Sequence, residues 1–199
     1  MDRLGKLESL FKRKDKIEGI DIGAILGLDK YRSITNVFEE KTKVVENSQR
    51  AVEARYWINT LEEVVSREFM IRTRKKIRKN NINSIDKDYE FMASNVNRKI
   101  IGENSILDCK LINGIDENDI FSVEFSKKFV MQAQHDMKVK KADKCYIAIL
   151  INGENFIIRE VMRDENLISK IVKVEEEFWN NYIEKNVEPK KPLSLDELD

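Results

Sequence analysis

The sequence predicts an α/β fold in which helices flank a mixed β-sheet. Apolar residues within 48–72 recur with the helical period, whereas residues 145–152 form an unbroken apolar run of strand length. Between these two segments, residues 91–110 have the pattern of two short strands joined by a turn. The order of helices, strands, helix, strands and helix places the sheet between helical layers.

The helices are predicted from apolar spacing and stop signals. A short amphipathic helix is expected within residues 1–16, and one or two further turns end at Gly27. The remaining helices are expected at 35–42, 48–72, 122–140 and 165–182. The apolar face of 48–72 consists of Ala51, Ala54, Tyr56, Trp57, Leu61, Val64, Val65 and Phe69. We interpret the aromatic residues of this face as core residues rather than as base-stacking platforms.

The strands are bounded by turn residues. We expect strands at 91–98 and 106–110 to pair as a hairpin whose turn is formed by residues 102–104. The basic run at 72–79 is predicted to begin a strand, and 80–88 to form a polar turn region. The apolar strand at 145–152 is expected to turn at Gly153 into a neighbouring strand at 156–162.

Length and composition limit the classes of protein. The 199 residues are predicted to form one domain over 1–187, followed by a mobile acidic tail over 188–199. Basic and acidic residues both number 36, so the net charge is zero and only local patches can favour nucleic acid. Two cysteines cannot build a disulfide framework, and neither a secretory signal nor a long apolar run is present. These features favour a soluble intracellular protein without a membrane partner.

Asp108 and Lys110 are the strongest candidates for chemistry. Because they lie two residues apart on a predicted strand, their side chains share one face, and Cys109 points to the other. A carboxylate that holds a divalent cation, beside an ammonium that orients water or phosphate, is the minimal equipment for metal-assisted phosphodiester hydrolysis. Such hydrolysis needs no histidine, so we interpret the single histidine, His135, as a residue that packs or hydrogen-bonds beside the glutamines rather than as a catalytic base. The alternative is an ordinary surface strand with alternating charges.

Four blocks of sequence, in this order, resemble the YqaJ-type viral recombinase family, which contains the lambda exonuclease and belongs to the PD-(D/E)XK nuclease superfamily. The blocks are 21–31, 56–62, the segment that ends in Asp108-Cys109-Lys110, and Gln132-Ala133-Gln134-His135. The likeness runs from about residue 10 to residue 187. It implies a restriction-endonuclease-like core, with a mixed central sheet flanked by helices, in a phage or prophage protein of the host cytoplasm.

The resemblance also implies roles for individual residues. Asp108 would be the bridging carboxylate and Lys110 the catalytic lysine, with Glu62 as a further acidic metal ligand. Gln134, with Gln132 nearby, would touch the nucleophile or the DNA backbone. Members of the family are similar to enzymes that use two Mg²⁺ or Mn²⁺ ions, and we expect the same cofactors here.

Further basic residues are candidates for contact with DNA. Arg13 stands where the family places an arginine for the 5′-phosphate, and a guanidinium suits a terminal phosphate because it donates paired hydrogen bonds. In the run at 72–79, Arg74, Lys76 and Arg78 are expected to bind phosphates. If they do, affinity falls steeply with salt through counterion release. The alternative is a solvated basic run with no ligand.

The chain departs from the family pattern at several positions. Asn97 stands where the family has a metal-binding aspartate, so the implied metal ligands are Glu62, Asn97 and Asp108. Glu18 and Ile20 occupy positions of a glycine and a small hydroxyl residue near the 5′-phosphate, and Ile58 replaces a glycine. An amide can ligate Mg²⁺ but carries no charge, and losing one electrostatic stabiliser can cost about 10²–10³ in rate. The amide reflects either a degenerate site or a deliberate substitution that traps a complex.

Two functions follow from these observations. The first is a recombination exonuclease that hydrolyses duplex DNA from 5′ ends and leaves 3′ single strands. By resemblance it would form a ring-shaped homo-oligomer, a trimer, and would work on DNA ends with a phage single-strand annealing protein. The second is a catalytically impaired nuclease fold that binds DNA or a protein partner, as a phage accessory or an inhibitor of a host factor.

Overall fold

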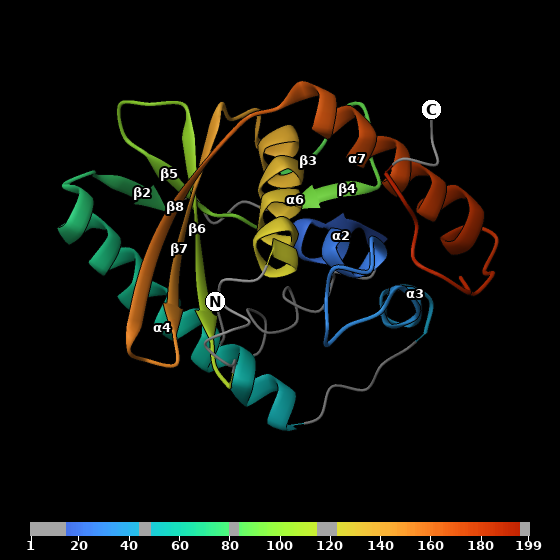
Figure 1. The fold of residues 1–199 in the computed structure, drawn as a ribbon, viewed down its shortest axis with the longest axis horizontal. Helices are drawn as coiled ribbons and strands as arrows, with labels where there is room; N and C mark the ends of the chain where they lie inside the picture. The colour runs from blue at the N-terminus through green and yellow to red at the C-terminus, as the bar shows by residue number, and fades with distance from the viewer. Residues whose placement is uncertain (1–14, 44–48, 80–83, 115–122, 196–199) are drawn as a thin grey trace, which may run out of the picture.

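The computed structural model describes residues 15–43, 49–79, 84–114 and 123–195, and contains two sheets (Figure 1). The larger sheet has five strands in the order β2 (Ile77–Lys79), β5 (Arg98–Ile100), β6 (Ser105–Ile112), β7 (Lys144–Ile151) and β8 (Asn155–Met162). Strands β6 and β7 are parallel, and the other neighbours are antiparallel. The smaller sheet has the order β1 (Ile17–Glu18), β4 (Met92–Ser94) and β3 (Ser84–Ile85). The predicted mixed α/β fold is confirmed.

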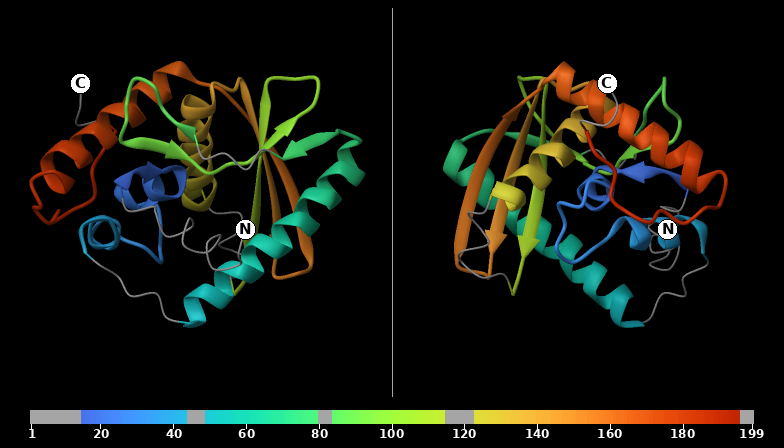
Figure 2. Two further views of the ribbon diagram at one scale, coloured as in Figure 1. Left: turned by 180° about the vertical axis from the view of Figure 1, so that it is seen from behind. Right: turned by 45° about the vertical axis from the view of Figure 1, so that its right-hand side comes forward.

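Helices cover both faces of the larger sheet. Helix α4 (Gln49–Thr73) packs on one face and α6 (Val123–Lys140) on the other, as Figure 2 shows. Helix α6 separates the large sheet from a second layer of α2 (Gly19–Ile25), the small sheet and α7 (Glu165–Phe178), which continues into a π-helical turn at Trp179–Ile183. Helix α3 (Ile34–Thr42) lies beside this layer. No helix within the described ranges combines the length and apolarity needed to cross a bilayer.

The alternation of side chains along β6 and β7 explains why helices cover both faces. Leu107 and Cys109 point toward α4 and pack in one buried cluster with its Val65 and Phe69. Ile106 belongs to a second buried cluster, which includes residues of α6. Since successive side chains of a strand point to opposite faces, a strand that is buried on both faces reads as a continuous apolar run. The predicted helices at 35–42, 48–72, 122–140 and 165–182 are confirmed within one or two residues, apart from the π-helical end of the last.

The predicted hairpin is partly wrong. Residues 92–94 belong to the small sheet as β4, and only β5 pairs with β6 in the large sheet, with Arg98 opposite Leu107. The chain therefore crosses from one sheet to the other between residues 94 and 98. The sequence pattern could not reveal this crossing, because both short segments alternate in the same way.

The predicted apolar face of α4 is wrong in its first half and also at Val64, which is 55% exposed. Tyr56 and Trp57 are 45% and 51% exposed, whereas Val65 and Phe69 are fully buried. Figure 1 shows the reason, because the N-terminal part of α4 extends past the ends of the strands. The two exposed rings contact each other edge to face, with centroids 5.5 Å apart.

Two further expectations at the ends of the chain differ from the structure or lie beyond it. Residues 188–195, placed in a mobile tail, pack against α2: Leu193 is buried and its N–H donates to the Ile25 carbonyl. Pro192 lies against Gly27, whose φ of 70° ends α2 as predicted. The expected helix within 1–16 lies almost wholly outside the described residues.

His135 is a buried structural cation. Its Nδ1 lies 2.7 Å from Glu175 Oε1 and its Nε2 lies 2.8 Å from the Ala93 carbonyl oxygen. Because both partners are acceptors, both ring nitrogens donate, which describes an imidazolium. Burial opposes the charge, but Glu175 outweighs it and raises the pKa of His135 to about 9. The interpretation of His135 as a packing residue agrees with this geometry.

We expect this pair to make stability depend on pH. The folded-state pKa of His135, about 9, exceeds the unfolded value of about 6.5. Its contribution is therefore fully present below pH about 6.5 and is lost as pH rises through about 9, by at most about 3 kcal/mol. Thermal unfolding followed by circular dichroism should show a lower midpoint at pH 9 than at pH 6.5. In Glu175→Gln, an amide still accepts from a neutral imidazole, so this difference should largely disappear; an equal pH dependence in both proteins would contradict the assignment.

Candidate active site

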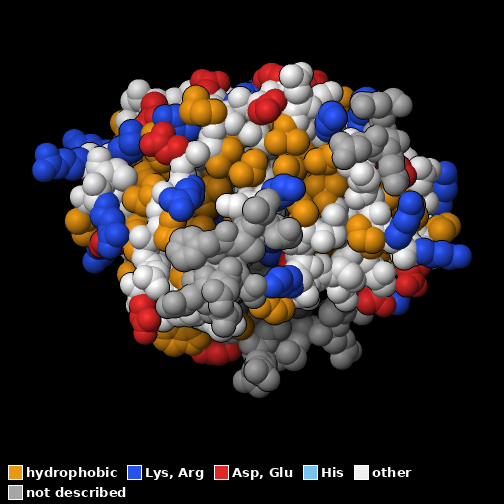
Figure 3. Space-filling model, in the orientation of Figure 1, with side chains coloured by type: hydrophobic (Ala, Val, Ile, Leu, Met, Phe, Trp, Pro, Cys, Tyr) orange, Lys and Arg blue, Asp and Glu red, His pale blue; other side chains and the backbone are white. Residues whose placement is uncertain are grey.

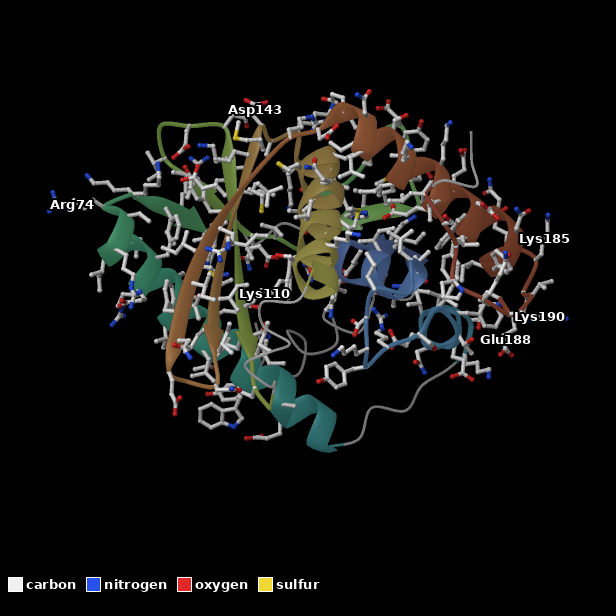
Figure 4. The ribbon with its side chains drawn as sticks, in the orientation of Figure 1. Arg74, Lys110, Asp143, Lys185, Glu188 and Lys190 are labelled. Atoms are coloured by element: carbon white, nitrogen blue, oxygen red, sulfur yellow. The ribbon has the colours of Figure 1, made fainter. Side chains whose placement is uncertain are left out.

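Asp108 and Lys110 meet Gln132 between β6 and α6. The Lys110 ammonium lies 3.0 Å from Asp108 Oδ2, and the Gln132 amide donates to the same oxygen at 3.2 Å. Lys110 is labelled beside β6 in Figure 4. Gln132 is buried on α6, so its amide holds the carboxylate in one position. The pair predicted from sequence is therefore a fixed, partly buried ion pair rather than two solvated charges.

The short length of β5 opens the edge of β6 at this point. Arg98 and Lys99 pair with Leu107 and Ile106, and from Asp108 onward this edge carries no described partner strand. In the described part of the chain, the edge of β6 from Asp108 onward is therefore unpaired beside the start of β5. A ligand can approach Asp108 there without disrupting the sheet.

Lys110 remains protonated at neutral pH. Burial disfavours its ammonium, but the negative charges of Asp108, Asp136 and Glu62 outweigh burial and raise the pKa of Lys110. A lysine in this state donates hydrogen bonds and supplies positive charge, and it does not act as a base.

A second group of charged residues joins the start of β5 to helix α4. Arg98 is buried, and its guanidinium pairs with Glu62 at 3.3 Å and with Glu63 at 3.1 Å. The same guanidinium donates to the side-chain oxygen of Asn97 at 3.0 Å. Burial raises the pKa of Glu62, Arg98 opposes this, and the carboxylate of Asp108 adds to the increase. Glu62 and Asp108, 46 positions apart in the sequence, thus lie within electrostatic reach of each other.

The carboxylates at this edge are of the chemical type that binds a divalent cation. Two carboxylates that repel each other, Glu62 and Asp108, flank the open strand edge, and carboxylate oxygens are the ligands that Mg²⁺ prefers. A bound cation would relieve this repulsion. The described residues hold no cluster of three or more His, Cys, Asp or Glu arranged for a metal, so the amide of Asn97 is the remaining predicted ligand. This amide is committed to Arg98 in the structure.

The structure separates the two glutamines of α6. Gln132 contacts Asp108, whereas Gln134 donates to the Met162 carbonyl at 2.8 Å and accepts from the Asp164 N–H at 3.0 Å. Residues two apart on a helix do not share a face, so the two amides cannot serve one site. Gln134 thus joins α6 to the start of α7, and Gln132 is the glutamine that the structure brings to the candidate site.

The basic run divides into two sets. Lys75 pairs with Glu103, Lys79 pairs with Glu63, and Arg72 pairs with Glu68. Arg74, Lys76 and Arg78 are exposed, and the structure pairs none of them with a described carboxylate. Figure 4 places Arg74 at the far end of α4, away from Lys110. On the face in Figure 3, both acidic and basic side chains are present.

The segment predicted to hold a 5′-phosphate is lined by acids. Glu18 is buried directly before α2, and Ile20 is partly exposed. A Cβ on Gly19 would lie 2.7 Å from Asp136 Oδ2, so only glycine fits between the two acids. Arg13, the predicted phosphate ligand, lies outside the described residues.

Two charged residues near the site were not predicted. Arg98 directly follows Asn97, and this position next to a predicted metal ligand could have indicated that Arg98 belongs to the site. Asp136 is buried one helical turn after Gln132, and Ser94 donates to its Oδ1 at 2.7 Å, while its Oδ2 has no partner among the described residues. Burial raises the pKa of Asp136 to about 6, His135 opposes this, and Asp108 adds to it. The spacing of four from Gln132 would have placed Asp136 on the same helix face.

The fold and site define a class of protein. A mixed sheet flanked by helices, with a carboxylate and a lysine two residues apart on a central strand and an acid on a flanking helix, is the PD-(D/E)XK nuclease fold. Residues 10–143 match the profile of the YqaJ-like viral recombinase domain. The chain belongs to this family, which the resemblance had indicated.

Known proteins support this assignment. The uncharacterized protein YqaJ of Bacillus subtilis (strain 168) is 36% identical over 178 residues, which cover 88% of this chain and 56% of that protein. The chain thus spans little more than half the length of this relative.

Solved structures share the fold at low sequence identity. An alkaline exonuclease from Laribacter hongkongensis, LHK-Exo, superimposes with a TM-score of 0.64 at 12% identity over 88% of this chain and 91% of that one. A phage-related exonuclease from Haemophilus somnus 129PT gives 0.59 at 15% identity, over 86% and 96% of the two chains. LHK-Exo has also been solved in complex with dAMP, and that structure gives 0.63 at 15% identity over 89% and 92%.

Proposed function

We propose that this protein is a metal-dependent exonuclease that hydrolyses duplex DNA from 5′ ends and leaves 3′ single strands. The observation that carries the proposal is the Asp108–Lys110 ion pair, fixed by Gln132 at an open strand edge and within electrostatic reach of Glu62. Family membership and the shared fold with proteins described as exonucleases support it.

Each residue of the site has a separate part in this proposal. Glu62 and Asp108 would hold Mg²⁺ or Mn²⁺, with Asn97 as a neutral third ligand. Such an ion supplies positive charge to the phosphate and lowers the pKa of a bound water. The Lys110 ammonium would orient the attacking water and offset charge on the phosphate oxygens. Gln132 would keep the Asp108 carboxylate in position.

Three finer points rest on resemblance alone. They are two ions per site, a ring of three subunits, and cooperation with a phage single-strand annealing protein. Phage origin and a location in the host cytoplasm likewise stay predictions. Arg13, Arg74, Lys76 and Arg78 stay the predicted contacts to DNA, and Gln134 a predicted site residue that the geometry favours less than Gln132.

Linear duplex DNA tests the proposal directly. With a label at either the 5′ or the 3′ end, nucleotides should be released first from the 5′ end in Mg²⁺ or Mn²⁺, and chelation by EDTA should stop the release. Substrates with 5′-phosphate and 5′-hydroxyl ends test the role of the acidic segment around Glu18. Release that persists in EDTA, or release from the 3′ end alone, would contradict the proposal.

The second candidate function is binding without hydrolysis. The observation that favours it is Asn97, an uncharged ligand whose oxygen accepts from Arg98 in the structure. Under this second function, the fold binds DNA or a protein partner and the site does not hydrolyse DNA. Hydrolysis by the unmodified chain that Lys110→Met abolishes would exclude it, and hydrolysis by the Asn97→Asp variant alone would favour it.

A further inference from the structure

We propose that a pocket lined by four lysines beside Asn97 binds a phosphodiester of the DNA strand that passes the active site. The proposal rests on the proposed function, because it assumes that DNA is the ligand of the site. It adds a binding site that is separate from Glu62, Asp108 and Lys110 and from the basic run at 72–79.

The pocket is built from three elements that are remote in sequence. It has a volume of about 240 Å³ and is lined by Ser84, Ile85, Lys87, Val96, Asn97, Lys99, Val139, Lys140 and Lys141. Strand β3, the start of β5 and the end of α6 thus contribute to one hollow. Asn97 connects this hollow to the active site, because its side chain also contacts Arg98, the partner of Glu62.

Three of the four pocket lysines are not paired with acids in the described part of the chain. The structure pairs none of Lys87, Lys99 and Lys141 with a carboxylate of the described residues. Lys140 is half-buried, and its ammonium donates to Ser84 Oγ at 3.0 Å, which fixes it at the pocket wall. Burial lowers the pKa of Lys140; Asp136, one turn earlier on α6, opposes this, and Lys99 adds to it. An anion placed among these lysines would reduce the repulsion between the ammonium groups of Lys99 and Lys140.

An alternative account explains only part of the cluster. Lys140 is the last residue of α6 and Lys141 directly follows it, at the helix end where cations interact favourably with the helix dipole. Lys87 and Lys99 come from other elements and have no such reason to lie there. The convergence of all four on one hollow is therefore better explained by an anionic ligand. A DNA phosphate fits because lysines bind phosphates as point charges.

The test compares salt dependence of DNA binding in two matched variants. Lys99→Gln/Lys140→Gln removes two charges from the pocket, and the new amide at 140 can still donate to Ser84. Lys185→Gln/Lys190→Gln removes two charges from exposed positions beyond the π-helical turn that follows α7 (Figure 4). Fluorescence anisotropy with a labelled duplex that carries a single-stranded end, in EDTA to prevent hydrolysis, gives the slope of log K against log salt. Unfolding midpoints establish that both variants fold.

We expect the pocket variant to bind more weakly and to lose about 1 from the magnitude of the slope, the value for one lost phosphate contact, while the control keeps the wild-type slope. Lys99→Arg/Lys140→Arg should keep the wild-type slope as well. Equal slopes in the pocket variant and in the control would overturn the pocket and leave the exonuclease proposal standing. A wild-type protein that binds no DNA would overturn both proposals.

Discussion

Asn97→Asp is expected to raise the rate of DNA hydrolysis by about 10²–10³, the usual size of one electrostatic stabiliser in an active site. The reason is local. The Asn97 oxygen lies 3.0 Å from the buried guanidinium of Arg98, so a carboxylate at this position gains a charged partner and is not left unpaired. A third negative charge beside Glu62 and Asp108 strengthens the binding of a divalent cation. Nucleotide release from linear duplex DNA, measured over a range of Mg²⁺ concentrations, should show both a higher maximum rate and a lower half-saturating Mg²⁺ concentration.

The controls for this variant separate charge from shape. Asn97→Ala removes the amide without adding charge and should not raise the rate. The double variant Asn97→Asp/Lys110→Met should lose the gain, because the added carboxylate acts through the same site. An Asn97→Asp protein that binds Mg²⁺ no better than the unmodified chain would show that residue 97 is not a metal ligand.

The sequence predicted the fold wherever one pattern has one structural meaning. The apolar run of β7 and the helical period around Phe69 led to the right elements, because burial on both faces of a sheet leaves few alternatives. The prediction failed at residues 92–98 and around Tyr56 and Trp57. Which sheet a short strand joins, and how far a helix extends past the strands beneath it, depend on neighbours that are remote in sequence.

The site was predictable in its strand residues and less so in its helix residues. Strand alternation placed Asp108 and Lys110 together, and the structure joins them at 3.0 Å. The choice between Gln132 and Gln134 depends on the rotation of α6 against β6, which a helical pattern alone does not define. Asp136 was missed because a carboxylate with an unpartnered buried oxygen is unusual, and sequence gives no sign of burial at a single polar residue.

Lys110→Met is expected to lower hydrolysis by at least about 10² and to leave DNA binding in EDTA nearly unchanged. Methionine keeps much of the length of the side chain and its apolar packing but removes the ammonium, which carries the charge that we assign to the water and the phosphate. Since the loss must be measurable, the comparison is best made in the more active Asn97→Asp background. Hydrolysis follows from nucleotide release, and binding follows from anisotropy with the same duplex.

A structural role for Lys110 makes a different set of predictions. If the ammonium served only to neutralise Asp108, then Asp108→Asn combined with Lys110→Met would restore an uncharged, stable pair, and each single change would lower the unfolding midpoint. A catalytic role requires instead that the Lys110→Met single variant stays inactive at a temperature where its stability matches that of the parent. Lys110→Arg adds a third comparison, because a guanidinium keeps the charge but is bulkier than the ammonium that lies 3.0 Å from Asp108. Arginine should therefore preserve stability better than methionine but recover little of the lost rate. Full recovery of the rate in Lys110→Arg would mean that the positive charge alone, and not its exact position, accounts for the effect of Lys110.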